Sequence, residues 1–170
     1  MLKKSLLTAV ATLLIALVLF MVYGIVEKVI AMKAVGEKKL TLDAVPFFNT
    51  DSTSYRFDSA NPIVLVHFNS ECDHCRYELT DLKENLTALQ QTNVLLMSSE
   101  SISVIRKVAA DFGVEQFSNV DFIKINRDDV YDNFGALSTP HIFIYGTDRK
   151  LIKEFKGETK IDAILQYLPK

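Results

Sequence analysis

The sequence predicts an α/β domain, with a central mixed β-sheet flanked by helices, preceded by one N-terminal transmembrane helix. Three observations carry this prediction. Beyond residue 40, apolar runs of strand length alternate with helical patterns, as in parallel βαβ units. The last two runs are separated by a short turn, which is typical of an antiparallel hairpin. Near the start of the chain, an uncharged apolar stretch has the length of a membrane-spanning helix.

The apolar stretch covers residues 5–26 and follows Lys3 and Lys4. A helix of about 20 apolar residues crosses a hydrocarbon core of roughly 30 Å. A cleavable signal peptide is the alternative, but its apolar core is shorter, roughly 7–15 residues, and is followed by small residues at the cleavage site. Residues 23–27 offer no such site. We therefore expect an uncleaved anchor over residues 5–26.

The orientation of the anchor does not follow from its flanking charges, because Lys28 and Lys33 balance the lysines on the other side. Residues 1–4 form only a minimal tail, so we expect this tail to be cytoplasmic and the globular part to be translocated. Residues 27–39 are then a stalk, and residues 40–170 form the domain. The expected location is the cell inner membrane, single-pass, with the domain on the periplasmic (extracytoplasmic) side.

Each element of the domain follows from a local pattern. The predicted strands cover residues 55–57, 63–68, 94–97, 120–125, 141–145 and 151–155. The run 63–68 is continuously apolar and β-branched, as in a buried central strand. The predicted helices cover residues 73–90, a segment capped by Ser101 or Ser103 and ended by Gly113, residues 128–134 and residues 162–168.

The chain contains only two cysteines, in the sequence Cys72-Asp73-His74-Cys75. They lie between a predicted strand and a predicted helix, and Thr139-Pro140 precedes a later strand. Two cysteines are too few for a disulfide scaffold, so the pattern favours a thiol–disulfide redox site. Half of a zinc site is the alternative. It would need two further ligands among His67, His74 and His141, whose spacing matches no familiar zinc pattern.

This order of elements, with C-D-H-C after one strand and Thr-Pro before another, resembles the thioredoxin-like superfamily. More narrowly it resembles the membrane-anchored bacterial redoxins of the ResA and TlpA type, which are thiol–disulfide oxidoreductases. The resemblance covers residues 40–170. Glu71 stands where many relatives have tryptophan, and Val66 stands where thioredoxins have a buried acid. The peroxiredoxin pattern would require proline at Leu65 and threonine at Asn69, and it is absent.

The resemblance implies roles for four residues. Cys72, at the tip of a helix whose dipole favours a thiolate, attacks a substrate disulfide, and Cys75 resolves the mixed disulfide. Pro140 is expected to be cis, and the backbone of Thr139 is expected to pair with an extended substrate segment. No cofactor is expected beyond the redox-active Cys72–Cys75 disulfide.

Four further side chains are expected to modulate the site. A cationic His74 would stabilise the thiolate, whereas the negative charges of Asp73 and Glu71 would oppose it. Glu78 could relay a proton to Cys75, although its polar helix position favours a solvated face. His141 faces either the site or the sheet, and we expect a structural role. We expect His67 to be a hydrogen-bonded core histidine.

The leading hypothesis is a membrane-tethered enzyme that reduces, or less often oxidises, disulfides of extracytoplasmic proteins. Its expected partners are protein thiols and disulfides, a transmembrane electron donor, and the membrane through the N-terminal helix. The formal net charge of −2 gives no reason to expect nucleic acid as a partner. The alternatives are a copper metallochaperone using Cys72, Cys75 and His141, a peroxiredoxin-like peroxidase, and a redox-inactive docking module.

Overall fold

The structure is a computed structural model that describes residues 2–42, 45–57, 61–113, 116–135 and 137–168. The first residue of the predicted tail and the last two of the predicted domain lie outside these ranges. The elements, in chain order, are α1 (Leu2–Lys38), β1 (Phe48–Asn49), β2 (Ile63–His67), α2 (Asp73–Glu84), a 3-10 turn η1 (Leu86–Leu89), β3 (Asn93–Ser98), α3 (Ile102–Phe112), β4 (Val120–Lys124), α4 (Arg127–Phe134), β5 (His141–Tyr145), β6 (Leu151–Lys156) and α5 (Ile161–Leu165).

The strands form one six-stranded sheet in the order β1-β4-β3-β2-β5-β6. The pairs β2–β3 and β3–β4 are parallel, whereas β1, β5 and β6 pair antiparallel with their neighbours. These pairings confirm the predicted mixed sheet, with parallel crossovers first and a hairpin last. Strand β2 is buried along its whole length between β3 and β5, as its continuous apolar run predicts.

Helices cover both faces of the sheet, because side chains alternate across a strand. Even-numbered residues of β2, such as Val64, share a core with apolar residues of α2, α3 and α5. Odd-numbered residues, such as Leu65, share a second core with residues of α4 and of the segment that precedes β1. The chain past α1 is therefore a three-layer sandwich, with α2 and α4 on opposite faces.

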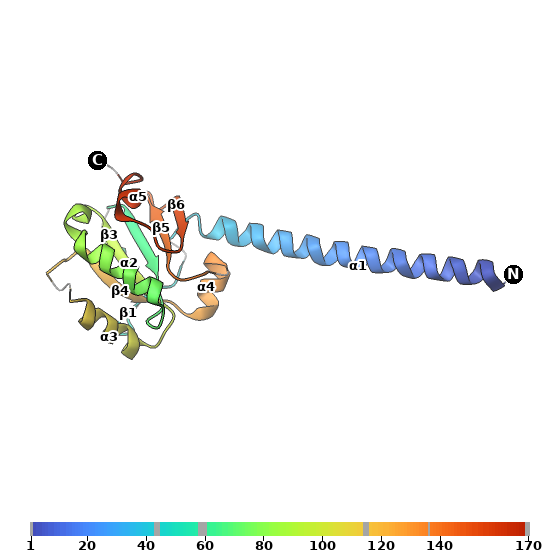
Figure 1. Cartoon of the computed structure of the whole chain (residues 1–170), viewed down its shortest axis with the longest axis horizontal. Helices are drawn as coiled ribbons and strands as arrows, with labels where there is room; N and C mark the ends of the chain where they lie inside the picture. The colour runs from blue at the N-terminus through green and yellow to red at the C-terminus, as the bar shows by residue number, and fades with distance from the viewer. Residues whose placement is uncertain (1, 43–44, 58–60, 114–115, 136, 169–170) are drawn as a thin grey trace.

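Helix α1 runs without a break through both the predicted anchor and the predicted stalk (Figure 1). Within the described residues, the part from Thr12 to Lys38 is the one segment long and apolar enough to cross a membrane. Its large side chains are exposed, Phe20 by 74%. A helix that exposes such side chains lacks the polar outer face of a helix in water, as expected for contact with lipid.

The C-terminal end of α1 is joined directly to the domain. The Tyr145 hydroxyl donates to the Lys39 carbonyl at 3.0 Å, and the Lys39 amine contacts Glu154 at 2.8 Å. Val35 lies against Gly135, where an added methyl group would come within 3.4 Å of its side chain. The helix therefore meets the domain at the β5–β6 hairpin and at the end of α4.

Residues 55–57 do not form the predicted strand. A tight turn, in which the Asn49 amide donates to the Thr53 carbonyl at 2.8 Å, reverses the chain and leaves Phe48–Asn49 as the strand. The rings of Tyr55 and Phe57 instead pack edge to face at 5.3 Å. Tyr55 and Phe57 therefore pack their rings together and lie outside the strands of the sheet.

Two predicted helices differ in extent. The predicted helix 73–90 ends as α2 at Glu84 and continues as η1, because the Asn85 side chain donates to the Asp81 carbonyl at 2.7 Å and its backbone leaves the helical conformation. The last helix, α5, ends at Leu165, three residues before the predicted end.

Candidate redox site

Cys72 occupies the N-cap of α2, five residues after β2 ends. Its sulfur accepts a hydrogen bond from the Cys75 amide at 3.3 Å and donates to the Thr139 carbonyl at 3.5 Å. Both cysteines are free thiols, Cys72 half-buried and Cys75 fully buried. One sulfur is therefore accessible at the tip of the helix, and the other lies one turn further in.

The two thiols have opposite pKa shifts. Burial by itself raises the pKa of Cys72, but hydrogen bonds from Cys75 and the charge of His74 outweigh it, so the pKa lies below its ordinary value. Burial, the hydrogen bond to Cys72 and the charge of that thiolate raise the pKa of Cys75 to about 12. Cys72 is thus the more acidic of the two thiols, and Cys75 keeps its proton at neutral pH.

Two charged residues next to Cys72, Asp73 and His74, are paired with other side chains. The His74 ring contacts the Glu158 carboxylate, which raises the pKa of the imidazole through a hydrogen bond and through its charge. Asp73 pairs with Arg76, which offsets the negative charge that the sequence led us to expect beside Cys72. The Glu71 side chain points into solvent. Of the charges next to Cys72, that of His74, whose pKa is raised, is thus the one that lowers the pKa of the thiol.

The loop that leads into Cys72 is held by Glu100, a residue that we did not predict. The Glu100 carboxylate accepts from the Ser70 amide at 2.8 Å and from the Ser70 hydroxyl at 2.6 Å. Glu100 follows β3, and the C-terminal ends of neighbouring parallel strands share one sheet edge. An acid three residues after the predicted strand 94–97, which was expected to lie next to the cysteine strand, was the signal that could have identified it.

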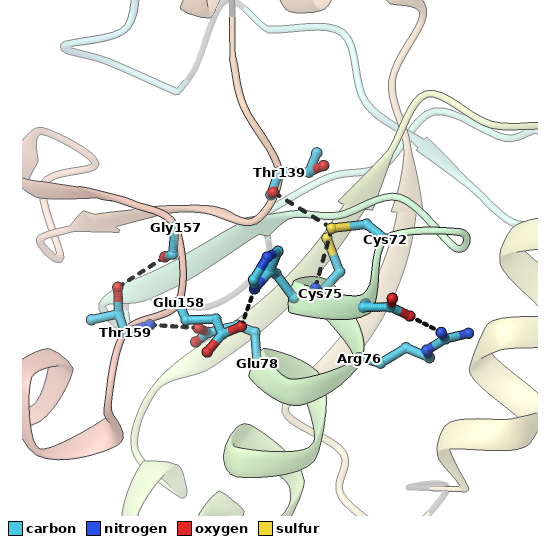
Figure 2. A network of polar contacts seen from close by, with 10 residues as sticks. Cys72, Cys75, Arg76, Glu78, Thr139, Gly157, Glu158 and Thr159 are labelled. Carbon is cyan, nitrogen blue, oxygen red and sulfur yellow. Dashed lines mark hydrogen bonds and ion pairs between the residues drawn. The ribbon is translucent and has the colours of Figure 1, made fainter.

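Thr139 and Pro140 lie beside the cysteines, although 67 residues separate Cys72 from Thr139. The peptide bond between Thr139 and Pro140 is cis. Figure 2 shows the Thr139 carbonyl directed at the Cys72 sulfur. The carbonyl of Pro140 accepts from the Gly157 amide at 2.9 Å, so the residue that follows β6 helps to hold this segment.

Glu78 is buried, with 2% of its surface exposed, so the expected solvated position is wrong. The segment between β6 and α5 covers it, and the Thr159 amide donates to Glu78 Oε2 at 2.7 Å. Burial, reinforced by the charges of Asp81 and Glu158, raises the pKa of Glu78 to about 7. Glu78 therefore changes its charge near neutral pH, one helical turn beyond Cys75.

His141 is directed away from the cysteines. It is 2% exposed, stacks on Phe143 at 4.5 Å and lies 3.5 Å from Glu154 Oε2. Phe143 belongs to the core on the odd-numbered face of the sheet, whereas Cys75 packs on the other face. The described residues contain no cluster of three or more His, Cys, Asp or Glu side chains arranged to hold a metal ion. The structure therefore does not assemble the copper-site alternative.

His67 lies opposite His141 across the β2–β5 pair, and it is buried. The expected core position of His67 is confirmed, but its Nδ1 has no hydrogen-bond partner among the described residues, so the expected hydrogen bonding is wrong for that atom. Burial and the neighbouring charge of His141 lower the pKa of His67 to about 4. The imidazole is therefore neutral in the folded protein at neutral and mildly acidic pH.

Acid should destabilise the protein through His67. Its pKa is about 4 when folded and 6.5 when unfolded, so the unfolded chain binds the proton more tightly. The neutral imidazole contributes stability above pH 6.5, and this contribution is lost as the pH falls towards 4. The contribution of His67 to the free energy of unfolding should fall by about 3 kcal/mol over that interval. Urea titrations of the parent and His67→Gln chains in detergent micelles, followed by circular dichroism, give this contribution as the difference between the two pH curves.

The His67→Gln variant should lack this contribution, so its pH curve should diverge from that of the parent protein by the same amount between pH 6.5 and pH 4. The His74→Gln variant is the matched control, because the pKa of His74 is shifted in the opposite direction. A His67→Gln curve as steep as that of the parent protein would contradict the assignment.

The sheet order, the C-x-x-C at the N-terminus of α2 and the cis Thr139–Pro140 bond beside it define a thioredoxin-like fold. No family model matches the chain, and no curated protein matches it. Solved structures do match, and they are thioredoxin-like proteins.

Three of these structures illustrate the similarity. The exposed lipoprotein thioredoxin of Streptococcus pneumoniae has a TM-score of 0.55 at 21% identity, covering 71% of this chain and 94% of that chain. MTB DsbF has a TM-score of 0.61 at 14% identity, with 76% and 94% covered. StoA of Bacillus subtilis has a TM-score of 0.53 at 11% identity, with 74% and 98% covered. At such identities the similarity establishes the fold alone.

Proposed function

We propose that the protein is a membrane-tethered thiol–disulfide oxidoreductase that reduces disulfides in proteins outside the cytoplasm. The observation that carries the proposal is the asymmetry of the two thiols. The accessible Cys72 has a lowered pKa, whereas burial raises that of Cys75 to about 12. An exposed thiolate followed by a protected thiol is the arrangement that a two-step exchange needs.

In the first step the Cys72 thiolate attacks one sulfur of a client disulfide. The client S–S bond breaks, a Cys72–client bond forms, and the released client thiolate takes a proton. In the second step Cys75 loses its proton and attacks the Cys72 sulfur. This step forms the Cys72–Cys75 disulfide and frees the second client thiol. Two electrons thus pass to the client, and a transmembrane dithiol donor returns two electrons to the pair.

Neighbouring groups fit these steps. The imidazolium of His74, favoured by Glu158, stabilises the Cys72 thiolate. The raised pKa of Glu78, about 7, suits it to take the proton that Cys75 must release. The Thr139 carbonyl, next to the Cys72 sulfur, suits the binding of an extended client backbone.

The cellular setting is part of the proposal. Helix α1 spans the inner membrane once, and the domain lies on the periplasmic side. Support comes from the exposed apolar surface of α1, which suits contact with lipid. The free thiol pair also supports it, because the protein disulfides that such a pair would reduce form outside the cytoplasm. The copper alternative lacks support from His141, and the peroxidase alternative lacks its proline and threonine at Leu65 and Asn69.

The test is a stoichiometric exchange with the full chain in detergent micelles. Reduced protein is mixed with oxidised insulin in excess, and thiols are counted by mass spectrometry after alkylation. We expect each chain to lose both thiols and insulin to gain two. Equilibration with glutathione buffers then gives the potential of the pair, which separates a reductant from an oxidant. A chain that stays reduced while insulin stays oxidised would overturn the proposal.

A further inference from the structure

A small cavity lies beside the redox site, between α2 and the segment that joins β6 to α5. Its volume is about 160 Å³. Its lining consists of Tyr77, Glu78, Asp81, Glu158, Thr159 and Lys160. Figure 2 shows Glu78 and Glu158 approaching each other from these two elements, beside Thr159. The lining contains three carboxyl groups and one amine, so acidic side chains outnumber basic ones.

One carboxylate oxygen in this cavity is buried and unused. Glu78 Oε2 accepts from the Thr159 amide, but Glu78 Oε1 has no hydrogen-bond partner among the described residues. A buried acceptor without a donor costs free energy, and native proteins seldom leave one unpaired. Lys160 lines the same cavity without donating to this oxygen. The cavity therefore has acceptor capacity that its own residues do not satisfy.

The other two carboxylates each contact another group in the described part of the chain. Asp81 Oδ2 accepts from the Ile161 amide at 3.1 Å, and Glu158 contacts His74 at the rim of the cavity. Each carboxylate has about four acceptor positions, so both can take further donors. A volume of about 160 Å³ is roughly five times the share of one water molecule, about 30 Å³. It has room for a guanidinium group, whose planar donors match carboxylate pairs.

The cavity lies within reach of a client held at Cys72. Along α2, Glu78 is about 9 Å from Cys72, at roughly 1.5 Å per residue. An extended client covers that distance in about three residues, at roughly 3.3 Å each. A side chain three residues from the client cysteine can therefore enter the cavity while the cysteine meets the Cys72 sulfur.

We propose that this cavity binds a cationic client side chain, arginine above all, located about three residues from the disulfide cysteine. The inference rests on the proposed function, since it names a feature of the clients that the same site reduces. It makes the cavity a specificity site, separate from the sulfur chemistry itself.

The test compares disulfide-linked peptides that differ in one side chain. Each carries arginine or citrulline three residues before or after its cysteine, because citrulline keeps the shape and lacks the charge. The rate of reduction by the reduced full chain in detergent micelles is measured for each. We expect the arginine peptide, on one side of the cysteine, to react about tenfold faster, as charge-assisted hydrogen bonds would give.

Two variants locate the effect. Asp81→Asn keeps an acceptor for the Ile161 amide but removes a charge from the cavity, and it should abolish most of the arginine preference, measured as the ratio of the arginine rate to the citrulline rate in the same variant. Glu84→Gln removes an equal charge from an exposed position of α2 outside the cavity, and it should keep the preference. A preference lost equally in both variants would mean long-range attraction and would overturn the cavity as the site.

The outcomes separate this inference from the proposed function. If the parent protein reduces arginine and citrulline peptides at equal rates, the cavity proposal is wrong and the oxidoreductase proposal stands. If it reduces neither, both are wrong. The parent protein alone decides between these results, so they do not depend on how well any variant folds.

Discussion

The Cys75→Ser protein is expected to accumulate a covalent complex with its clients and to lose turnover by about a thousandfold or more. Cys72, with its lowered pKa, should still attack a client disulfide. Without the Cys75 thiol, the resulting mixed disulfide has no internal route to resolution. Membranes from cells that produce this variant should contain higher-mass species that disappear on reduction. Non-reducing gels followed by mass spectrometry of the excised bands measure them.

The Cys72→Ser protein is the matched control. It should form no mixed disulfide, because the remaining thiol is buried and burial raises its pKa to about 12. This protein should lose client disulfide reduction as completely as the Cys75→Ser protein does. The reason differs, because here no nucleophile remains to attack the client disulfide. Client complexes that form through Cys75 in the Cys72→Ser protein would contradict the assignment of the nucleophile.

Replacing Glu78 by glutamine is expected to make the protein more stable at alkaline pH. The pKa of Glu78 is about 7 in the folded protein, against 4.5 for the ordinary carboxyl group. Because the folded pKa is raised, the neutral carboxyl contributes stability below pH 4.5, and this contribution is lost as the pH rises through 7. A shift of about 2.5 pKa units corresponds to a loss on the order of 3 kcal/mol.

Glutamine carries no charge at any of these pH values and can still accept from the Thr159 amide. The Glu78→Gln protein should therefore show no such loss between pH 5 and pH 9. Denaturant titrations of the full chain in micelles at several pH values give the comparison. The Glu84→Gln protein, altered at an exposed position, should follow the parent curve. Parallel curves for the Glu78→Gln and parent proteins would show that Glu78 is not the titrating group.

Local patterns were sufficient to predict five of the six strands of the sheet. The apolar run before Cys72 marked the central strand, because a strand buried on both faces is apolar at consecutive residues, and the two runs after Pro140 marked the hairpin. The C-x-x-C at a strand-to-helix junction, together with the later Thr139-Pro140, then indicated the candidate site.

Long-range contacts account for what the patterns missed. Glu78 occupies a polar helical position, but Thr159, 81 residues later, covers it. Glu158 reaches His74 from a separation of 84 residues. The missing partner of His67 Nδ1 depends on the packing of two strands distant in sequence. Helical and strand periodicity report only which local face is apolar, and therefore carry no signal for such contacts.

The contacts that join α1 to the domain fix the direction in which Cys72 faces about the axis of the helix. A domain on a flexible linker could present Cys72 in any direction, whereas this domain turns only together with α1. Each residue in a helix adds about 100° of rotation and 1.5 Å of height. Two residues inserted between Glu27 and Val35 would therefore turn Cys72 by about 200° about that axis, away from the membrane donor of the proposed function. Seven would move it by about 10 Å along the axis and nearly restore its direction.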